Sequence, residues 1–259
     1  MAYCEPNSAF RNIPIYHLED AIIKSVPLMT RKGKISLEDD PDRIADKMVK
    51  DPQIDEFCWS LYFDAPFLIR LFYAGFLPIC SNIGAVGDPI YVLLPKLHFS
   101  RCIVDLSGQR RKKIRNVSKY TLTVNSQFEN VVQGCLEQHS LDRCWLYPPL
   151  RSSLAELNRG EKPIVHSIEL TKDGKLVAGE IGYTVGSIYT SMTGFYRESG
   201  AGSIQLMLLE GLLRKQGFEI WDLGMEMEYK RNQLGANLMS RKNFVRTVRE
   251  LRGKTVQLT

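Results

Sequence analysis

The chain has 259 residues, of which 44% are hydrophobic and 24% charged. This balance is typical of one large or two modest globular domains and excludes an intrinsically disordered protein. The best candidate for a transmembrane helix, residues 68–80, is interrupted by Arg70. It is also too short to cross a bilayer. The N-terminus carries Glu5 and no apolar run, so the sequence predicts no secretory signal.

Six cysteines stand far apart in the sequence: Cys4, Cys58, Cys80, Cys102, Cys135 and Cys144. They form no C-x-x-C pair, and no histidine stands near them at the spacing of metal ligands. This pattern is typical of buried, reduced thiols in an intracellular protein. We therefore expect a cytoplasmic protein that holds no metal ion.

The net charge of +5 is concentrated in two basic segments, 109–120 and 241–254. Together they hold twelve Lys and Arg and one acid, and the rest of the chain has 22 Lys and Arg against 28 Asp and Glu. Two basic segments on an acidic body favour one positive face that would attract a polyanion such as nucleic acid. The alternative is that both segments are solvated and serve solubility.

The first half of the chain predicts few regular elements. Residues 1 to about 56 are expected to be an auxiliary segment with a short helix over 42–50. Residues 57–99 are aromatic and apolar. A short strand over 120–124 and a helix over 125–138 follow, the helix beginning at residues that cap helices well.

The second half predicts three consecutive strands, over 164–170, 175–185 and 188–193. The first turn is Asp173-Gly174, a dipeptide that favours tight hairpins, and the second is Gly186-Ser187. Such short connections join antiparallel neighbours.

A glycine-rich loop follows the third strand and opens a helix over 203–215, after which 218–223 is one more strand. The loop reads Arg197-x-x-Gly200-x-Gly202 and resembles the pyrophosphate loop of GCN5-related N-acetyltransferases (GNAT). Backbone N–H groups at a helix start bind phosphate when no side chain shields them. We expect an α/β (α+β) fold: a GNAT-like, mixed, largely antiparallel sheet flanked by helices, with a smaller N-terminal domain. The expected domains are 1–96 and 97–259.

From about Phe67 onward the chain resembles the leucyl/phenylalanyl-tRNA–protein transferases. The residues that carry the resemblance are Leu68 to Pro78, Leu94-Pro95-x-Leu97-His98-Phe99-Ser100-Arg101, His166-Ser167-Ile168-Glu169, Asp222, Leu234-Gly235-Ala236 and Arg241-Lys242. The resemblance implies transfer of an amino acid from charged tRNA to a protein N-terminus, within a pathway of protein degradation. Charged tRNA would be the co-substrate, and no cofactor would be needed.

The resemblance also implies a mechanism in which the acceptor amine attacks the ester carbonyl and a carboxylate network takes a proton. Asp222 matches the key aspartate of the family, at the end of a strand and facing the cleft. A carboxylate so placed can accept a proton or orient its neighbour. The alternative for Asp222 is that it only caps the turn.

The sequence departs from the family at two positions. Gly224 stands where the family usually has Gln, and Met192 where it usually has Glu. Glu180 lies on the adjacent strand, where a hairpin centred on Gly186-Ser187 would bring it opposite Met192 and Thr193. We therefore expect Glu180 or Glu226 to supply the missing carboxylate. The alternative for Glu180 is a partly buried glutamate that pairs with a lysine.

Glu180 has a second interpretation, because the resemblance places this position in the pocket for the transferred side chain. A carboxylate there would suit Arg better than Leu or Phe. The expected substrate-binding residues are Tyr189, Met192, Leu209, Leu213 and Trp221, together with Arg197, Gly200 and Gly202 of the loop. The alternative is that the apolar members are core residues.

The basic segments are expected to follow the phosphates of the tRNA acceptor stem without reading bases. The expected tRNA-binding residues are Arg110, Arg111, Lys112, Lys113, Arg115, Arg241, Lys242 and Arg246. We expect protein N-termini and aminoacyl-tRNA as partners, and neither membrane nor DNA. Two alternative functions stay open: an acyl-coenzyme A-dependent N-acyltransferase, and an inactive module that binds tRNA or N-termini.

Overall fold

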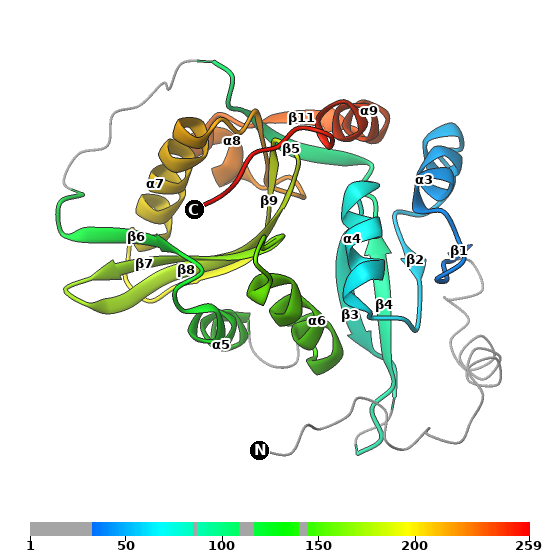
Figure 1. Ribbon diagram of the computed structural model, residues 1–259, viewed down its shortest axis with the longest axis horizontal. Coiled ribbons are helices and arrows are strands. Elements are labelled where there is room, and N and C mark those ends of the chain that lie inside the picture. Colours follow the sequence, from blue (N-terminus) through cyan, green and yellow to red (C-terminus); the bar gives the residue numbers. More distant parts are fainter. Residues whose placement is uncertain (1–32, 85–86, 109–116, 140–143) are drawn as a thin grey trace. The chain divides into compact units, whose positions relative to one another are not determined.

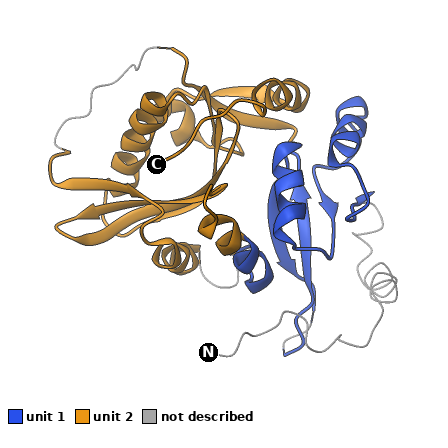
Figure 2. Ribbon diagram, viewed as in Figure 1, with its two compact units in different colours: residues 1–97, 145–153 blue, residues 98–144, 154–259 orange. Residues whose placement is uncertain are grey.

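The computed structural model describes residues 33–84, 87–108, 117–139 and 144–259 (Figure 1). The chain forms two compact units, one of residues 1–97 with 145–153 and one of residues 98–144 with 154–259 (Figure 2). The sequence placed the boundary after residue 96 and assigned 145–153 to the C-terminal domain. Leu146 and Leu150 in this segment are buried, and Tyr147 packs its ring against Tyr91 with centroids 5.4 Å apart.

In the described part of the first unit, two small sheets pack with helices α3 (Pro41–Lys50) and α4 (Ala65–Tyr73). The strands of these sheets are β1 (Gly33–Lys34), β2 (Cys58–Trp59), β3 (Leu77–Asn82) and β4 (Tyr91–Lys96). Strands β1 and β2 pair in parallel, and β3 and β4 pair antiparallel. Helix α3, the helix expected over 42–50, begins where the Asp40 side chain accepts a hydrogen bond from the Asp42 N–H.

The second unit is built on a seven-stranded sheet. Its elements are β5 (Ser100–Asp105), β6 (Tyr120–Val124), α5 (Phe128–His139), α6 (Pro148–Arg159, which begins in the first unit), β7 (Val165–Lys172), β8 (Lys175–Val185), β9 (Ile188–Tyr196), α7 (Ala201–Gln216), β10 (Ile220–Asp222), α8 (Glu228–Leu234), β11 (Asn237–Ser240) and α9 (Arg241–Leu251).

The strand order is β11-β5-β10-β9-β8-β7-β6, and every pair is antiparallel except β9 with β10. Those two parallel neighbours are joined by α7, because a parallel pair needs a crossover connection. The expectation of a mixed, largely antiparallel sheet flanked by helices is therefore confirmed.

The predicted turns are both present: Asp173-Gly174 joins β7 to β8, and Gly186-Ser187 joins β8 to β9. Strand β8 also has the predicted bounds. Strand β9 continues to Tyr196, three residues further than predicted. Its last residues pair with Ala178 and Gly179 of β8, a register that the hairpin pattern alone did not reveal.

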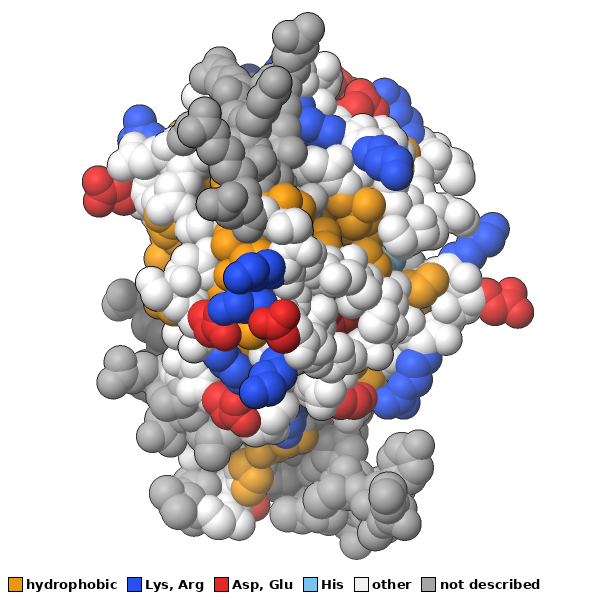
Figure 3. All heavy atoms as spheres, turned by 90° about the vertical axis from the view of Figure 1, so that its left-hand side faces the viewer, with side chains coloured by type: hydrophobic (Ala, Val, Ile, Leu, Met, Phe, Trp, Pro, Cys, Tyr) orange, Lys and Arg blue, Asp and Glu red, His pale blue; other side chains and the backbone are white. Residues whose placement is uncertain are grey.

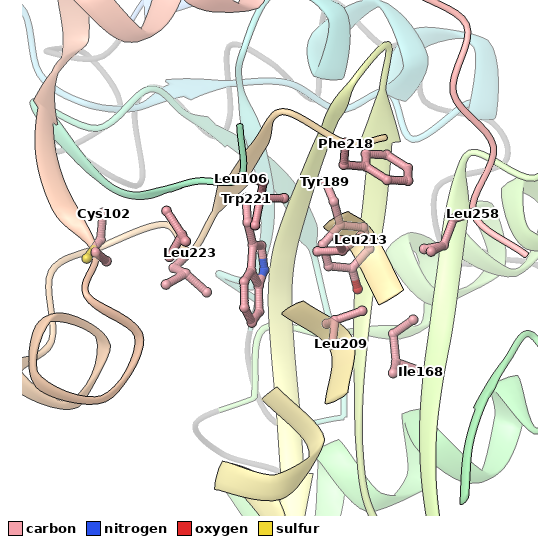
Figure 4. Packing of buried hydrophobic residues seen from close by; sticks show 12 residues of the cluster. Cys102, Leu106, Ile168, Tyr189, Leu209, Leu213, Phe218, Trp221, Leu223 and Leu258 are labelled. Carbon is pink, nitrogen blue, oxygen red and sulfur yellow. The ribbon is translucent and has the colours of Figure 1, made fainter. Parts of the chain in front are cut away.

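One side of this sheet packs against α7 through a core cluster of buried apolar residues. Leu209 and Leu213 of α7 lie against Tyr189 of β9 and Trp221 of β10 (Figure 4). All four side chains have 0% exposed area. Burying each such side chain contributes about 1.5–3 kcal/mol, so this cluster fixes α7 and the strands it covers.

No helix among the described residues is long and apolar enough to cross a bilayer. Within the same residues, no group of three or more His, Cys, Asp or Glu is placed to hold a metal ion. The five cysteines of the described ranges are free and buried, and burial raises the pKa of Cys80 to about 12. Cys4 lies outside the described residues.

The turn between β8 and β9 depends on the absence of a side chain at Gly186. Its φ is +58°, and a Cβ there would lie 2.0 Å from the backbone oxygen of Leu251. We predict that Gly186→Ala lowers the free energy of unfolding by about 3 kcal/mol or more, from strain and displaced backbone together. Urea unfolding followed by circular dichroism measures the change.

Gly174 in the turn between β7 and β8 is the matched control. Its φ is +75°, but a Cβ there would meet nothing within 4 Å. Gly174→Ala should lose only the backbone term, about 1 kcal/mol. Equal losses for the two variants would mean that the contact with Leu251 does not constrain the fold.

Candidate functional site

The two central carboxylates lie on opposite faces of the sheet. Asp222 pairs with Ile103 of β5 and Thr190 of β9, and residues directly paired across strands share a face. Trp221, one residue earlier, points to the other side, toward α7. Glu180 lies on this second face, because its carboxylate bonds to Tyr189 and to Gln205 of α7. The expected network that joins Asp222 and Glu180 is therefore divided by the sheet.

Asp222 is held by a buried arginine. Arg101 of β5 donates from Nε to both carboxylate oxygens at 3.1 Å and from Nη2 to Oδ2 at 2.5 Å. The Thr190 hydroxyl donates to Oδ2 at 3.2 Å, and the Gly224 N–H donates to Oδ1 at 2.8 Å. Both charged side chains have 0% exposed area. A buried ion pair persists only when hydrogen bonds satisfy its remaining atoms, as they do here.

Arg101 is itself fixed from several sides. Its Nη1 lies 2.6 Å from the Nδ1 of the buried His98, and its guanidinium stacks over the Phe244 ring of α9 at 4.6 Å. The Tyr183 hydroxyl is a further hydrogen-bond partner, and burial raises the pKa of Tyr183 to about 12. The face of the sheet that carries Asp222 is thus a closed polar core.

The expectation that Asp222 faces the cleft is wrong. The carboxylate is fully buried, and Arg101, Thr190 and the turn at Gly224 share its hydrogen-bonding capacity. A carboxylate in this state orients its neighbours and ties β5, β9 and β10 together. In the described conformation it is not exposed to a substrate.

The Glu180 cluster consists of Glu180, Tyr189, Ser191, Gln205 and Trp221. The Tyr189 hydroxyl and the Ser191 hydroxyl donate to Oε1 of Glu180, at 2.8 and 2.7 Å. The Gln205 amide donates to Oε2 at 3.0 Å. The Trp221 indole N–H in turn donates to the Ser191 oxygen at 2.9 Å. Four elements, β8, β9, β10 and α7, therefore converge on one carboxylate.

The surroundings of Glu180 differ from the lysine pairing and from the cross-strand partners expected from the sequence. Its side chain is buried, with 3% exposed area, and it bonds to three neutral donors rather than to a lysine. Across the hairpin it pairs with Gly194, not with Met192 or Thr193. Burial raises the pKa of Glu180, while the hydrogen bonds from Gln205, Ser191 and Tyr189 oppose this rise.

The expected apolar pocket is closed. Tyr189, Leu209, Leu213 and Trp221 all belong to the core cluster of Figure 4, so the alternative that they are core residues is the one the structure supports. Met192 is half-buried. It is the extra residue of a β-bulge, because Ser191 pairs with Gly182 and Thr193 pairs with Ile181.

The glycine-rich loop forms the start of α7. Gly200 is the N-cap residue with a φ of +81°, and no side chain caps this end of the helix. A Cβ at Gly202 would lie 3.5 Å from the exposed Tyr196 ring. Arg197 forms an ion pair with Glu137 of α5 at 3.0 Å and lies over the Phe195 ring at 5.2 Å. Arg197 is therefore partly occupied by protein contacts.

Glu226 lies apart from the other two carboxylates, on the surface. It forms an ion pair with Arg231 at 2.9 Å, with both side chains about half exposed. The same residues line an open hollow of about 830 Å³ together with Met227, Glu228, Asn232, Gly235, Ala236 and Asn237.

The buried Lys230 of α8 holds the chain that precedes this hollow. Its Nζ donates to the backbone oxygens of Leu223 at 2.6 Å and of Met225 at 2.8 Å, and burial lowers its pKa. The side chain therefore fixes the turn after β10.

The expected tRNA-binding residues have different surroundings. Arg241 is buried and stacks on Phe99 at 4.3 Å, so its expected role at a solvated phosphate-binding surface is wrong for this conformation. Lys242 is exposed, and the exposed Arg246 pairs with Glu250 at 3.8 Å. The residues expected in the first basic segment, Arg110, Arg111, Lys112, Lys113 and Arg115, lie outside the described residues.

Figure 3 shows the face of the molecule on the side of β6, β7 and α7. Basic and acidic side chains alternate on it, with hydrophobic side chains between them. Among the described residues, the part of this face that is visible therefore carries both signs of charge.

Sequence reasoning missed Arg101, Thr190 and Tyr183 around Asp222, and Ser191 and Gln205 around Glu180. Arg101 had a signal, because it is a charged residue followed directly by the apolar run Cys-Ile-Val of a strand. Buried charges are rare unless they are paired, so such a residue predicts a buried partner. Ser191 and Gln205 had no comparable local signal.

Comparison with known proteins adds three findings. A family model described as leucyl/phenylalanyl-tRNA protein transferase matches residues 100–249. The leucyl/phenylalanyl-tRNA–protein transferase of Hydrogenovibrio crunogenus is 30% identical over 181 residues, which cover 68% of each chain. That of Pseudomonas putida is 31% identical over 159 residues, covering 61% of this chain and 66% of the relative.

Among solved structures, a GCN5-related N-acetyltransferase from Kribbella flavida has a TM-score of 0.35 at 11% identity, covering 78% of this chain and 73% of its own. A TM-score this low carries no argument about fold or function.

Breaking the ion pair of Arg101 and Asp222 should strongly destabilise the second unit. We predict that Asp222→Asn lowers the free energy of unfolding by about 3–5 kcal/mol, because it leaves the Arg101 charge buried and uncompensated. Arg159→Met, which breaks the exposed pair with Glu129 at 3.0 Å, should have little effect. Urea unfolding of both variants tests this, and similar losses would contradict the prediction.

His166 should make stability depend on pH. Its Nδ1 lies 3.2 Å from the Asn125 amide and its Nε2 3.2 Å from the Thr184 hydroxyl, and burial lowers its pKa to about 4. The unfolded chain binds this proton near pH 6.5, so stability is complete above that pH. About 3 kcal/mol should be lost as the pH falls from 6.5 to 4. Denaturant titrations at several pH values should show this slope, and His166→Gln should reduce it.

Proposed function

Because the chain belongs to the leucyl/phenylalanyl-tRNA–protein transferase family, we propose that it transfers an amino acid from an aminoacyl-tRNA to the α-amino group of a protein N-terminus. The family is one of aminoacyltransferases, as the name of its members states. The observation that carries the proposal is the match over residues 100–249, which contains the Glu180 cluster and the ion pair of Arg101 and Asp222. The product would enter a degradation pathway that reads N-terminal residues.

The transferred amino acid in this proposal is Leu or Phe. A carboxylate accepts about four hydrogen bonds, and Glu180 already accepts three from protein donors. A guanidinium needs two parallel acceptor positions on one carboxylate, so binding Arg at Glu180 would displace one of these donors. This saturation favours a role for Glu180 in the chemistry over a role in selecting Arg.

Charged tRNA is the co-substrate, and the reaction as proposed uses no metal ion or resident cofactor. Lys242 and Arg246 on the exposed side of α9 remain candidates for contacts with tRNA phosphates. The proposal places the protein in the cytoplasm, where charged tRNA is available.

One observation favours a second candidate, an acyl-coenzyme A-dependent N-acyltransferase. The start of α7 at Gly200 has a left-handed backbone and no capping side chain, so its N–H groups could approach a pyrophosphate. Saturable binding of coenzyme A in the absence of tRNA binding would support this candidate.

Transfer assays test the proposed function. Radiolabelled Leu, Phe or Arg on tRNA is offered to model proteins that begin with Arg, Lys, Asp or Glu, and label in acid-precipitated protein is counted. We expect transfer of Leu or Phe to the basic N-termini, at least about tenfold faster than transfer of Arg, since substrate selection of this kind involves about 1–3 kcal/mol.

Transfer of Arg to the acidic N-termini would instead make Glu180 a residue that selects the transferred side chain. Binding of tRNA without transfer of any amino acid would favour an inactive binding module. If neither transfer nor tRNA binding occurs, the coenzyme A measurement decides whether the second candidate replaces the first.

A further inference from the structure

Ser191 is the most accessible member of the Glu180 cluster. Glu180, Tyr189, Gln205 and Trp221 are buried, with exposed areas of 3% or less, whereas Ser191 is half-buried. A group outside the core can therefore exchange a proton with Glu180 most directly through the Ser191 hydroxyl, which lies 2.7 Å from the carboxylate.

The bonding of Ser191 leaves one position open to a substrate. A serine hydroxyl has one hydrogen to donate and two lone pairs that accept. Its hydrogen goes to Glu180 at 2.7 Å, and one lone pair receives the Trp221 N–H at 2.9 Å. The second lone pair can accept one N–H from an incoming group, so this hydroxyl is oriented to pass a proton toward the carboxylate.

The bulge at Met192 determines which residue lies opposite Glu180, whereas Ser191 reaches the Glu180 face through the regular register of the hairpin before the bulge. Side chains alternate along a strand, so Ser191 and Thr193 would share a face if β9 were regular. Because Met192 is an extra residue, Thr193 lies with Ile181 on one face while Ser191 lies with Gly182 and Glu180 on the other. Bulges often re-aim one side chain in this way near functional sites.

Two glycines leave the space that the cluster needs. A Cβ at Gly182, which pairs with Ser191, would lie 2.3 Å from the Tyr189 hydroxyl and 2.7 Å from the Thr190 backbone oxygen. A Cβ at Gly194, which pairs with Glu180, would lie 3.1 Å from the Glu180 Cβ. Larger residues at either position would move the hydroxyl groups away from the carboxylate.

We infer that Ser191 is a catalytic residue that relays a proton from the acceptor α-amine to Glu180. This inference rests on the proposed function. The neutral amine nitrogen attacks the ester carbonyl carbon, its N–H proton passes to Ser191 Oγ, and the Ser191 proton passes to Glu180. The new C–N bond forms as the C–O bond to the tRNA ribose breaks. Glu180 returns the proton through Ser191 to the leaving ribose oxygen, which restores both side chains.

Tyr229 of α8 is a partly exposed residue that the charge of Glu180 influences. Tyr229 has 40% of its surface exposed, yet burial and the charge of Glu180 both raise its pKa. Tyr229 follows Glu228, which lines the open hollow described above. The electrostatic influence of Glu180 thus extends to the part of α8 that borders this hollow.

Kinetics of matched variants test the relay. Ser191→Ala and Glu180→Gln should each lower kcat about 100-fold or more with KM nearly unchanged, since a positioned base contributes about 10²–10⁴-fold. The double variant should be no slower than the worse single variant, because the two side chains act as one unit. Ser191→Thr, which keeps a hydroxyl, should retain most of the activity.

Ser167→Ala is the control for the structural effect of losing a serine. The buried Ser167 hydroxyl donates to the buried Glu169 at 2.6 Å in the same sheet, so this variant removes a similar bond. We expect comparable thermal unfolding for the two alanine variants but an unchanged kcat for Ser167→Ala. If the kcat of Ser191→Ala equals that of Ser167→Ala, the relay is wrong.

The pH profile of kcat separates a base from a structural residue. The base must be deprotonated, so kcat should fall as the pH drops through the pKa of Glu180, which burial raises. Glu180→Gln should abolish this limb and leave a slow, flatter profile. Persistence of the limb in Glu180→Gln would overturn the relay. Failure of the wild-type protein to transfer any amino acid would contradict the proposed function itself.

Discussion

The buried ion pair of Arg101 and Asp222 is the interaction on which the centre of the second unit depends. It joins β5 to β10, and through the Thr190 hydroxyl it also reaches β9. Phe244 of α9 covers the guanidinium, so one helix is fixed to the same pair. Desolvating two charges is costly, and only this complete set of partners makes the arrangement stable. The pair therefore adds a side-chain link between β5, β9 and β10 to the backbone pairing of these strands.

Alternation along the strands then separates two tasks. Asp222 and Trp221 are neighbours in sequence, but they point to opposite faces of the sheet. The face of Asp222 is closed by Arg101 and α9, while Trp221 belongs to the cluster around Glu180 under α7. One short strand thus contributes a structural carboxylate to one face and an indole N–H to the other. Substitutions on the two faces should affect stability and chemistry to different degrees.

The sequence contained the local geometry of the site but not its long-range partners. The turn at Gly186, the full length of β8 and the start of α7 near Gly200 followed from patterns within a few residues. The pairing of Arg101 with Asp222 spans 121 positions, and no local pattern records it. The bulge at Met192 was equally hidden, because the sequence of β9 does not mark an extra residue, and the shift shows only in the pairing with β8.

The two departures from the family pattern can be understood from backbone geometry. Gly224 has a φ of +72°, a conformation that strains a side chain such as Gln, and its N–H reaches back to Asp222 at 2.8 Å. Met192 occupies the bulge, whose effect is to place Gly194 instead of Thr193 opposite Glu180. In both places the polar side chain that the family resemblance leads one to expect is absent, and the backbone takes part instead. A glycine N–H supports Asp222, and a shift of register turns Thr193 away from Glu180 and leaves Gly194 opposite it. The polar groups proposed for chemistry therefore lie on the face of the sheet that α7 covers. Substitutions in the Glu180 cluster on that face do not remove a partner of the ion pair of Arg101 and Asp222 on the other face.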